Sequence, residues 1–276
     1  MSLESMVVEG SFGPVGITGW RGAGACIKGG VPILALHGFT GSSLDFDPLF
    51  KSLALSADAW AIDLPGHGAS YCGDRSVHYS LEACMDNFST VLTHVGVQRF
   101  SLLGYSMGGR IALHYARRYP ERVQQLILVS SSPGLGNSKA RQERCKQDEC
   151  LAKTILEEGM VAFIAKWQAN PLIASQKNIP AHIRAAMLER RLRNRPIGLV
   201  HSLRGLGTGV LPSLWDSLAA IKTETQLVTG SNDKKFKQIA QRMLNDLPVA
   251  RHVIIEGAGH APHLEALPLF QHLVVI

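Results

Sequence analysis

Short, continuous apolar segments alternate with helical patterns along most of the chain, and this alternation limits the possible folds more than any other feature. The segments are Ile33–Leu36, Ala59–Ile62, Phe100–Leu103, Leu126–Val129, Gln226–Val228 and His252–Ile255. Their continuity is typical of buried parallel strands, whereas a half-exposed antiparallel strand alternates apolar and polar residues. Strands separated by helices predict an α/β fold with a mostly parallel, doubly wound sheet.

The stretch after Ser80 shows the helical pattern most clearly. Ser80 is a good N-cap, apolar residues then recur on one helix face from Leu81 to Val95, and Gly96 ends the pattern. Residues 1–30 are rich in glycine and carry no helical pattern, so we expect an antiparallel hairpin at the edge of the sheet.

The alternation stops between about residues 135 and 205, where the pattern is helical and rich in arginine. We expect residues 135–205 to form a helical cap inserted in a single domain that comprises residues 1–276. Residues 139–204 hold 13 basic and 6 acidic residues, so this segment carries more than the whole net charge of +6. The excess indicates either a solvated helix face or the wall of a pocket for an anionic ligand. Nucleic acid fits less well, because interleaved aromatic residues and a binding motif are missing.

Composition sets the environment that we expect. A chain of 276 residues that is 46% hydrophobic can bury a large core without disulfides or metal. The five cysteines are odd in number and lack ligand spacing, which favours ordinary thiols in a reducing compartment. No apolar run reaches the roughly 18–20 residues of a membrane span, and the N-terminus lacks a secretion signal. We therefore predict a cytoplasmic protein without a membrane, metal or cofactor requirement.

The sequence Gly104-Tyr105-Ser106-Met107-Gly108 fits the pattern G-x-S-x-G between a predicted strand and a predicted helix. A serine on so tight a turn needs glycine neighbours, and the turn exposes its Oγ at the edge of the sheet. The amino end of the following helix favours the negative charge that develops during a reaction. Ser106 is therefore the predicted nucleophile or proton-transferring group.

A serine hydroxyl needs a base and an orienting carboxylate. Asp233 follows the predicted strand TQLVTG, and His260 follows HVIIEG. Both fall where parallel strands end, and the order Ser, Asp, His is that of nucleophile-elbow folds. The structural alternatives are an Asx turn for Asp233 and a loop histidine for His260, and His263 is the alternative base.

The sequence His37-Gly38-Phe39 follows the first predicted buried strand. In nucleophile-elbow folds, the backbone N–H after this His-Gly pair and the N–H after the serine form an oxyanion hole. These N–H groups belong to Phe39 and Met107. We expect His37, and likewise His67 in DLPGHG, to shape their loops rather than to act in catalysis.

The motifs LHGFTGS, DLPGHG, GYSMGG, GSND and GAGH, in this order and spacing, resemble the α/β-hydrolase superfamily over essentially the whole chain. Within it, HGFTGS, GYSMGGR, SSSPGL followed by two arginines, and GSNDKKF resemble the 2-succinyl-6-hydroxy-2,4-cyclohexadiene-1-carboxylate synthases. These are lyases of menaquinone and phylloquinone synthesis. Their substrate carries three carboxylates and loses pyruvate by elimination.

The resemblance implies a substrate pocket with several guanidinium groups, which pair bidentately with carboxylates and stay charged. Carried over from the family pattern, the substrate contacts are Arg110, Arg144, Arg193, Tyr105 and Trp167. Arg110 also lies about one helical turn after Ser106, so it can face the same cavity. Arg191 and Arg195 remain alternatives to Arg193, and each aromatic residue could equally serve in core packing.

The predicted function is therefore that of a monomeric lyase with a small polycarboxylate substrate, in the cytoplasm or in an organelle stroma after processing. Ser106, activated by His260 and Asp233, abstracts a ring proton, and pyruvate leaves. The first alternative is a carboxylesterase or C–C bond hydrolase for an acidic substrate, which shares the triad but differs in its need for the arginines. The second is a receptor without catalysis, for which an intact triad is superfluous.

Overall fold

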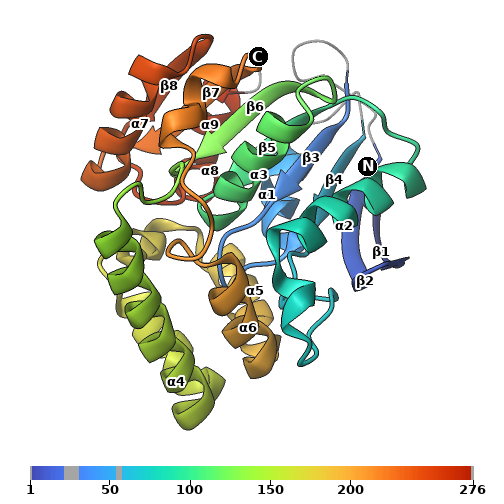
Figure 1. Cartoon of the computed structure of the whole chain (residues 1–276), viewed down its shortest axis with the longest axis vertical. Helices are drawn as coiled ribbons and strands as arrows, with labels where there is room; N and C mark the ends of the chain where they lie inside the picture. The colour runs from blue at the N-terminus through green and yellow to red at the C-terminus, as the bar shows by residue number, and fades with distance from the viewer. Residues whose placement is uncertain (1, 22–30, 54–57, 275–276) are drawn as a thin grey trace.

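Eight strands form one sheet through the middle of the molecule, in the order β1-β2-β4-β3-β5-β6-β7-β8 (Figure 1). The computed structural model describes residues 2–21, 31–53 and 58–274. The strands are β1 (Leu3–Gly10), β2 (Gly13–Trp20), β3 (Ile33–Leu36), β4 (Ala59–Ile62), β5 (Phe100–Tyr105), β6 (Val123–Val129), β7 (Glu224–Gly230) and β8 (Ala250–Ile255).

Strands β3 to β8 pair in parallel, whereas β1 and β2 form an antiparallel hairpin that joins β4 at the edge. The mostly parallel sheet is thereby confirmed, and so is the edge hairpin within residues 2–21. β3 and β4 have the predicted bounds, but β5 to β8 are two to four residues longer than predicted. The strands continue past the apolar segments because polar residues also take part in strand pairing. Gln125 of β6, for example, lies opposite Ser101 of β5 and Glu224 of β7.

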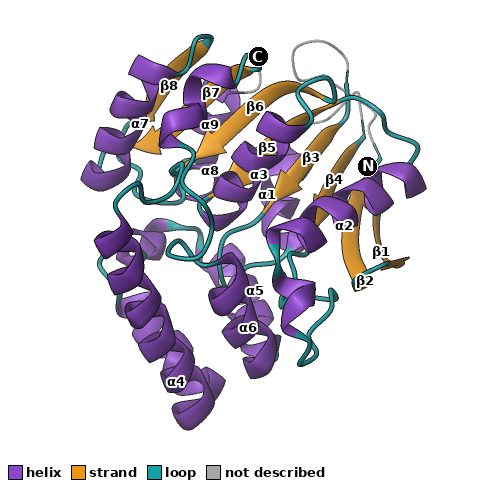
Figure 2. Cartoon of the chain, in the orientation of Figure 1, coloured by secondary structure: helices purple, strands orange, loops and turns teal. Residues whose placement is uncertain are grey.

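Helices cover both faces of the sheet, as Figure 2 shows. They are α1 (Asp47–Ser52), α2 (Leu81–His94), α3 (Met107–Arg118), α7 (Lys234–Asp246), α8 (Pro262–Glu265) and α9 (Leu267–Val274). Leu34 and Leu36 of β3 pack in one apolar cluster with α2, α3 and α7, while Ile33 and Ala35 pack in another with α1 and α9. Alternate side chains of a buried strand thus pack in apolar clusters on opposite faces of the sheet. Both sets must be apolar, which is why the strand sequences are apolar throughout.

Helix α2 has the predicted start. The Ser80 side chain accepts a hydrogen bond of 3.2 Å from the Ala83 N–H. After the helix, Gly96 adopts φ 69°, a left-handed conformation that favours glycine.

Three helices and two short 3-10 turns are inserted between β6 and β7, on the side where the parallel strands end (Figure 1). Residues 138–206 of this insertion, which we call the inserted segment, contain α4 (Ser138–Ala169), α5 (Ala181–Arg193) and α6 (Pro196–Leu206). Gly159 interrupts α4 with φ 79° and ψ 173°. Ile155 and Phe163 of α4 pack with Leu199 of α6 in an apolar cluster of their own.

Cys72, Cys84, Cys145 and Cys150 are free thiols, and the prediction for Cys26 lies outside the described residues. Within the described ranges, none of the helices combines the length and apolar character that crossing a membrane requires.

Candidate active site

Ser106 lies between β5 and α3 with φ 51° and ψ −108°, a left-handed backbone that is strained for any residue except glycine. The neighbouring glycines are required by close backbone contacts. A Cβ atom on Gly104 would lie 2.4 Å from the Gly109 Cα, and one on Gly108 would lie 2.3 Å from the Leu36 carbonyl oxygen. The G-x-S-x-G pattern therefore reflects the steric requirements of the turn that carries Ser106.

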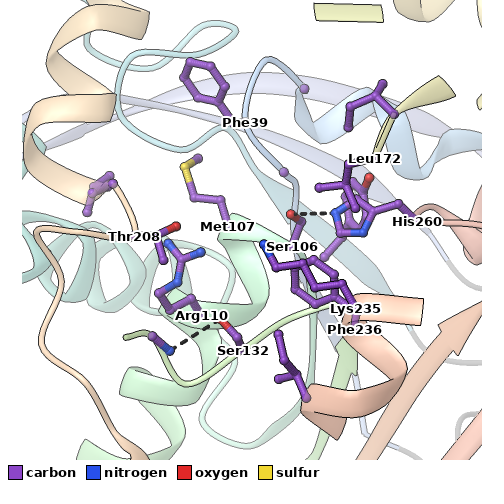
Figure 3. A pocket seen from close by; sticks show the side chains of 18 of the residues that line it. Phe39, Ser106, Met107, Arg110, Ser132, Leu172, Thr208, Lys235, Phe236 and His260 are labelled. Carbon is purple, nitrogen blue, oxygen red and sulfur yellow. Dashed lines mark hydrogen bonds between the residues drawn. The ribbon is translucent and has the colours of Figure 1, made fainter. Parts of the chain in front are cut away.

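The side chains of Ser106, His260 and Asp233 form a continuous hydrogen-bonded chain, and Figure 3 shows its link between Ser106 and His260. The Ser106 Oγ and the His260 Nε2 are 3.1 Å apart, and the His260 Nδ1 lies 2.7 Å from the Asp233 Oδ2. The other Asp233 oxygen accepts a bond of 3.1 Å from the Phe236 N–H and caps α7. Strand ends β5, β7 and β8 thus bring together three residues that are far apart in the sequence, in a geometry suited to proton transfer.

The other histidines near the site have different surroundings. His263, the alternative base, is buried with its ring 4.6 Å from that of Tyr105, and burial lowers its pKa to about 3. Within the described part of the chain, its Nδ1 has no hydrogen-bond partner. His37 accepts a bond from the Leu64 N–H and His67 one from the Thr40 N–H, so both connect loops. The geometry therefore favours His260 as the base.

Two backbone N–H groups beside Ser106 are free of partners among the described residues, namely those of Phe39 and Met107. Both residues line the same cavity as Ser106. The chain at Gly38 passes so close to the nucleophile turn that a Cβ there would lie 2.8 Å from the Tyr105 Cε1. Two unpaired N–H donors next to a serine can stabilise an oxygen that becomes negative during a reaction.

The cavity has a volume of about 720 Å³ and lies between the sheet edge and the inserted segment. Aromatic rings form part of its wall, with Phe39 and Trp167 5.4 Å apart. The basic residues that line it are Arg110, Arg144, Arg191, Lys235 and Arg242, and the acidic ones are Asp45 and Asp216. A cavity with this excess of cations suits a small ligand that carries several negative charges.

Arg110 and Arg144 form the first group of cations in the cavity. Arg110 is only 7% exposed, its Nε has no partner among the described residues, and burial together with Arg144 lowers its pKa to about 10. The Arg144 Nε donates a bond of 2.8 Å to Asp148, a buried carboxyl whose pKa is raised by burial. Two close guanidinium groups with one acidic neighbour leave positive charge that a ligand carboxylate can neutralise.

The structure corrects the choice among the arginines of α5. Arg193 is exposed, pairs with Glu189 and does not line the cavity. Arg191 is 6% exposed, lines the cavity and donates a bond of 2.8 Å to Gln176, which in turn bonds the Tyr105 hydroxyl. Two residues along a helix are separated by about 200°, so Arg193 points away when Arg191 points in.

The predicted aromatic contacts, Tyr105 and Trp167, both line the cavity. Sequence reasoning missed Asp148, Gln176 and Lys235. The spacing Arg144-x-x-x-Asp148 could have revealed the first, because residues four apart meet on a helix. The position of Lys235 next to Asp233 could have revealed the third, but no signal in the sequence marks Gln176.

The comparisons with known proteins agree with this geometry. Residues 31–267 match the alpha/beta hydrolase fold family. A Bacillus subtilis protein provisionally named 2-succinyl-6-hydroxy-2,4-cyclohexadiene-1-carboxylate synthase is 39% identical over 88% of this chain and 88% of its own. The Serratia proteamaculans protein of that name is 30% identical over 84% of this chain and 87% of its own.

Among solved structures, MenH from S. aureus superposes with a TM-score of 0.85 at 30% identity, covering 94% of this chain and 96% of its own. The motifs, the sheet with its bonded Ser106, His260 and Asp233, and these relatives lead to one assignment. The chain belongs to the alpha/beta hydrolase fold family and, within it, to the family of the 2-succinyl-6-hydroxy-2,4-cyclohexadiene-1-carboxylate synthases.

Proposed function

We propose that the protein is a lyase that eliminates pyruvate from 5-enolpyruvoyl-6-hydroxy-2-succinyl-cyclohex-3-ene-1-carboxylate. The product is 2-succinyl-6-hydroxy-2,4-cyclohexadiene-1-carboxylate, after which the relatives are named. The observation that carries the proposal is the bonded Ser106–His260 pair at the wall of a cavity that Arg110, Arg144 and Arg191 also line. A polycarboxylate held by these arginines would present its ring to the serine.

The triad would act as a base rather than as a source of an acyl-enzyme. His260, oriented by Asp233, takes the proton of Ser106, and the serine oxygen removes an acidic ring proton near the succinyl ketone. The N–H groups of Phe39 and Met107 then stabilise the enolate oxygen. A ring C=C bond forms as the C–O bond to the enolpyruvyl group breaks. Ser106 keeps the ring proton, and His260 gives its proton to the departing enolate, which becomes pyruvate. The triad is thereby restored, and the reaction consumes no water or cofactor.

The arginines would bind the substrate carboxylates. Arg110 and Arg144 approach from α3 and α4, and Arg191 approaches from α5, so they can hold different arms of the substrate. We also infer that the inserted segment serves as a cap, because it supplies Arg144, Trp167 and Arg191 to the cavity wall. A neutral ester would need none of these cations.

The proposal includes a monomer that works in the cytoplasm or in an organelle stroma. The free thiols at Cys72, Cys84, Cys145 and Cys150 support a reducing compartment. The substrate is a small molecule, which fits a cavity of about 720 Å³.

The test compares pyruvate release from the enolpyruvyl substrate with cleavage of a short-chain nitrophenyl ester, for the purified wild type and for Arg110→Ala. We expect fast pyruvate release with slow ester cleavage, and loss of the former in the variant. Fast ester cleavage without pyruvate release would contradict the proposal and indicate a carboxylesterase, which this triad could also support. Equal pyruvate release by both proteins would contradict the arginine site.

A further inference from the structure

Lys235 lies in the first turn of α7, two residues after Asp233, and lines the cavity. Figure 3 shows its side chain extending into the pocket beside Phe236. Asp233 holds this turn in place, since one of its oxygens bonds His260 and the other bonds the Phe236 N–H. The ammonium group is therefore carried by the same helical turn as the carboxylate of the triad.

The stability of α7 does not explain a lysine at this position. Cations are unfavourable in the first turn of a helix, where the helix dipole is positive. Lys237 has a local partner, because its Nζ donates a bond of 3.0 Å to the Ser231 carbonyl. Within the described chain, Lys235 makes no ion pair, and its Nζ lies 5.6 Å from the centre of the Phe236 ring. The amine is thus available to an anion in the cavity.

The neighbours of Lys235 indicate which part of the substrate it meets, provided that the proposed function holds. The Phe236 ring neighbours both Lys235 and His260, with its centre 4.7 Å from that of the His260 ring. In the proposed mechanism His260 holds the proton that it took from Ser106, so the departing enolpyruvyl group must come close to His260 to receive it. Arg110, Arg144 and Arg191 project from other helices.

We propose that Lys235 binds the carboxylate of the enolpyruvyl group and holds the leaving pyruvate beside His260. The three carboxylates of the substrate then meet separate cations from α3 and α4, from α5 and from α7. Lys235 is a substrate-contacting residue, and it takes no proton in the reaction.

Lys235→Gln and Lys234→Gln provide a matched test, because both remove one positive charge from adjacent residues of α7. Lys234 is exposed and does not line the cavity. For Lys235→Gln we expect KM for the enolpyruvyl substrate and the inhibition constant of added pyruvate each to rise about tenfold. Lys234→Gln should change both less than about twofold, and Lys235→Arg should restore most of the lost affinity.

The outcomes separate this inference from the proposed function. Wild-type kinetics in Lys235→Gln, or equal effects in the two glutamine variants, would overturn the inference and leave the function intact. A raised KM with an unchanged inhibition constant for pyruvate would also overturn it, because Lys235 would then meet another carboxylate. If the wild type released no pyruvate, the proposed function would fail and the inference would fail with it.

Discussion

The strand ends and the inserted segment build the same cavity by different means. Ser106, Asp233 and His260 follow β5, β7 and β8. The Ser106 and Asp233 N–H groups donate to carbonyls at the ends of β6 and β7, and the His260 N–H donates to the Ser175 hydroxyl. Arg144 lies in the second turn of α4 and Arg191 in the last turn of α5, so their direction depends on how those helices pack. The strand ends therefore fix the chemistry, whereas helix packing in the inserted segment fixes the recognition of the substrate.

This difference predicts different kinetic effects. Removal of a strand-end residue should lower kcat, because the reacting groups lose their partner. Removal of an arginine from the inserted segment should mainly raise KM, because the substrate loses a carboxylate contact while the triad stays intact. A strand-end variant that changed only KM, or an arginine variant that changed only kcat, would contradict this difference between the two regions.

The largest effect is expected for Ser106→Ala, which removes the group that abstracts the ring proton. We expect kcat for pyruvate release to fall at least about 10⁴-fold while binding of the substrate persists. Ser132→Ala is the control, since Ser132 also lines the cavity and, among the described residues, its hydroxyl bonds only the Gly134 N–H. It should retain kcat within a few-fold. A Ser106→Ala enzyme that still released pyruvate at a tenth of the normal rate would rule out this serine as the base.

The next effect separates two arginines of one helix. Arg191→Ala should raise KM about 30- to 100-fold, because a buried cation that meets a carboxylate contributes about 2–3 kcal/mol. Arg193→Ala should change KM less than about twofold, since its side chain is 75% exposed. Steady-state kinetics of the two variants decide the matter. The reverse order of effects would restore Arg193 as the substrate contact and refute the geometry of α5.

A smaller effect concerns the ion pair that connects the inserted segment to the sheet. Arg190 donates two hydrogen bonds, of 3.1 and 2.7 Å, to the largely buried Asp45. Arg190→Met should lower the free energy of unfolding by about 1–2 kcal/mol. Arg204→Met is the control, because Arg204 pairs with Glu149 at the surface, and it should change stability by less than about 0.5 kcal/mol. Urea denaturation measures both, and equal losses would show that the pair adds no anchoring.

The last effect concerns stability alone and appears only in acid, as a change in pH dependence. The pKa of His263 is lowered to about 3 by burial, so the unfolded chain binds one more proton than the folded protein between about pH 6.5 and 3. Stability is therefore fully present above about pH 6.5 and falls with acidification, by up to about 1.4 kcal/mol per pH unit for this group. His263→Leu should flatten the acid limb by that amount. Parallel stability curves for the variant and the wild type, measured by urea denaturation, would contradict this.

The sequence was sufficient to predict the features that depend on neighbouring residues in the chain, such as turns and strand ends. The turn at Ser106 requires Gly104 and Gly108, and a motif of this kind is visible without a structure. The strand ends before Asp233 and His260 follow from apolar segments, so the mostly parallel sheet was predicted and is confirmed. The hydrogen bonds between these residues required the structure.

Other features depend on contacts between distant segments. The sequence RRLRNRP offers several arginines within five positions, and only the packing of α5 decides that Arg191 points inward. Gln176 bonds both Arg191 and Tyr105, a contact over 71 residues of sequence that no local pattern encodes. Resemblance to a family gave the kind of residue that the pocket needs, but not its position in this chain.

The excess of positive charge in the cavity also acts on a substrate that has not yet reached it. Of the residues that the structure describes, five basic and two acidic ones line it, and one of those acids, Asp45, is already paired with Arg190. Such a concave positive region attracts a trianion through solvent, over the roughly 8 Å that physiological salt allows and further in dilute buffer. Added salt should therefore slow the encounter of enzyme and substrate, and kcat/KM should fall with ionic strength while kcat stays nearly constant.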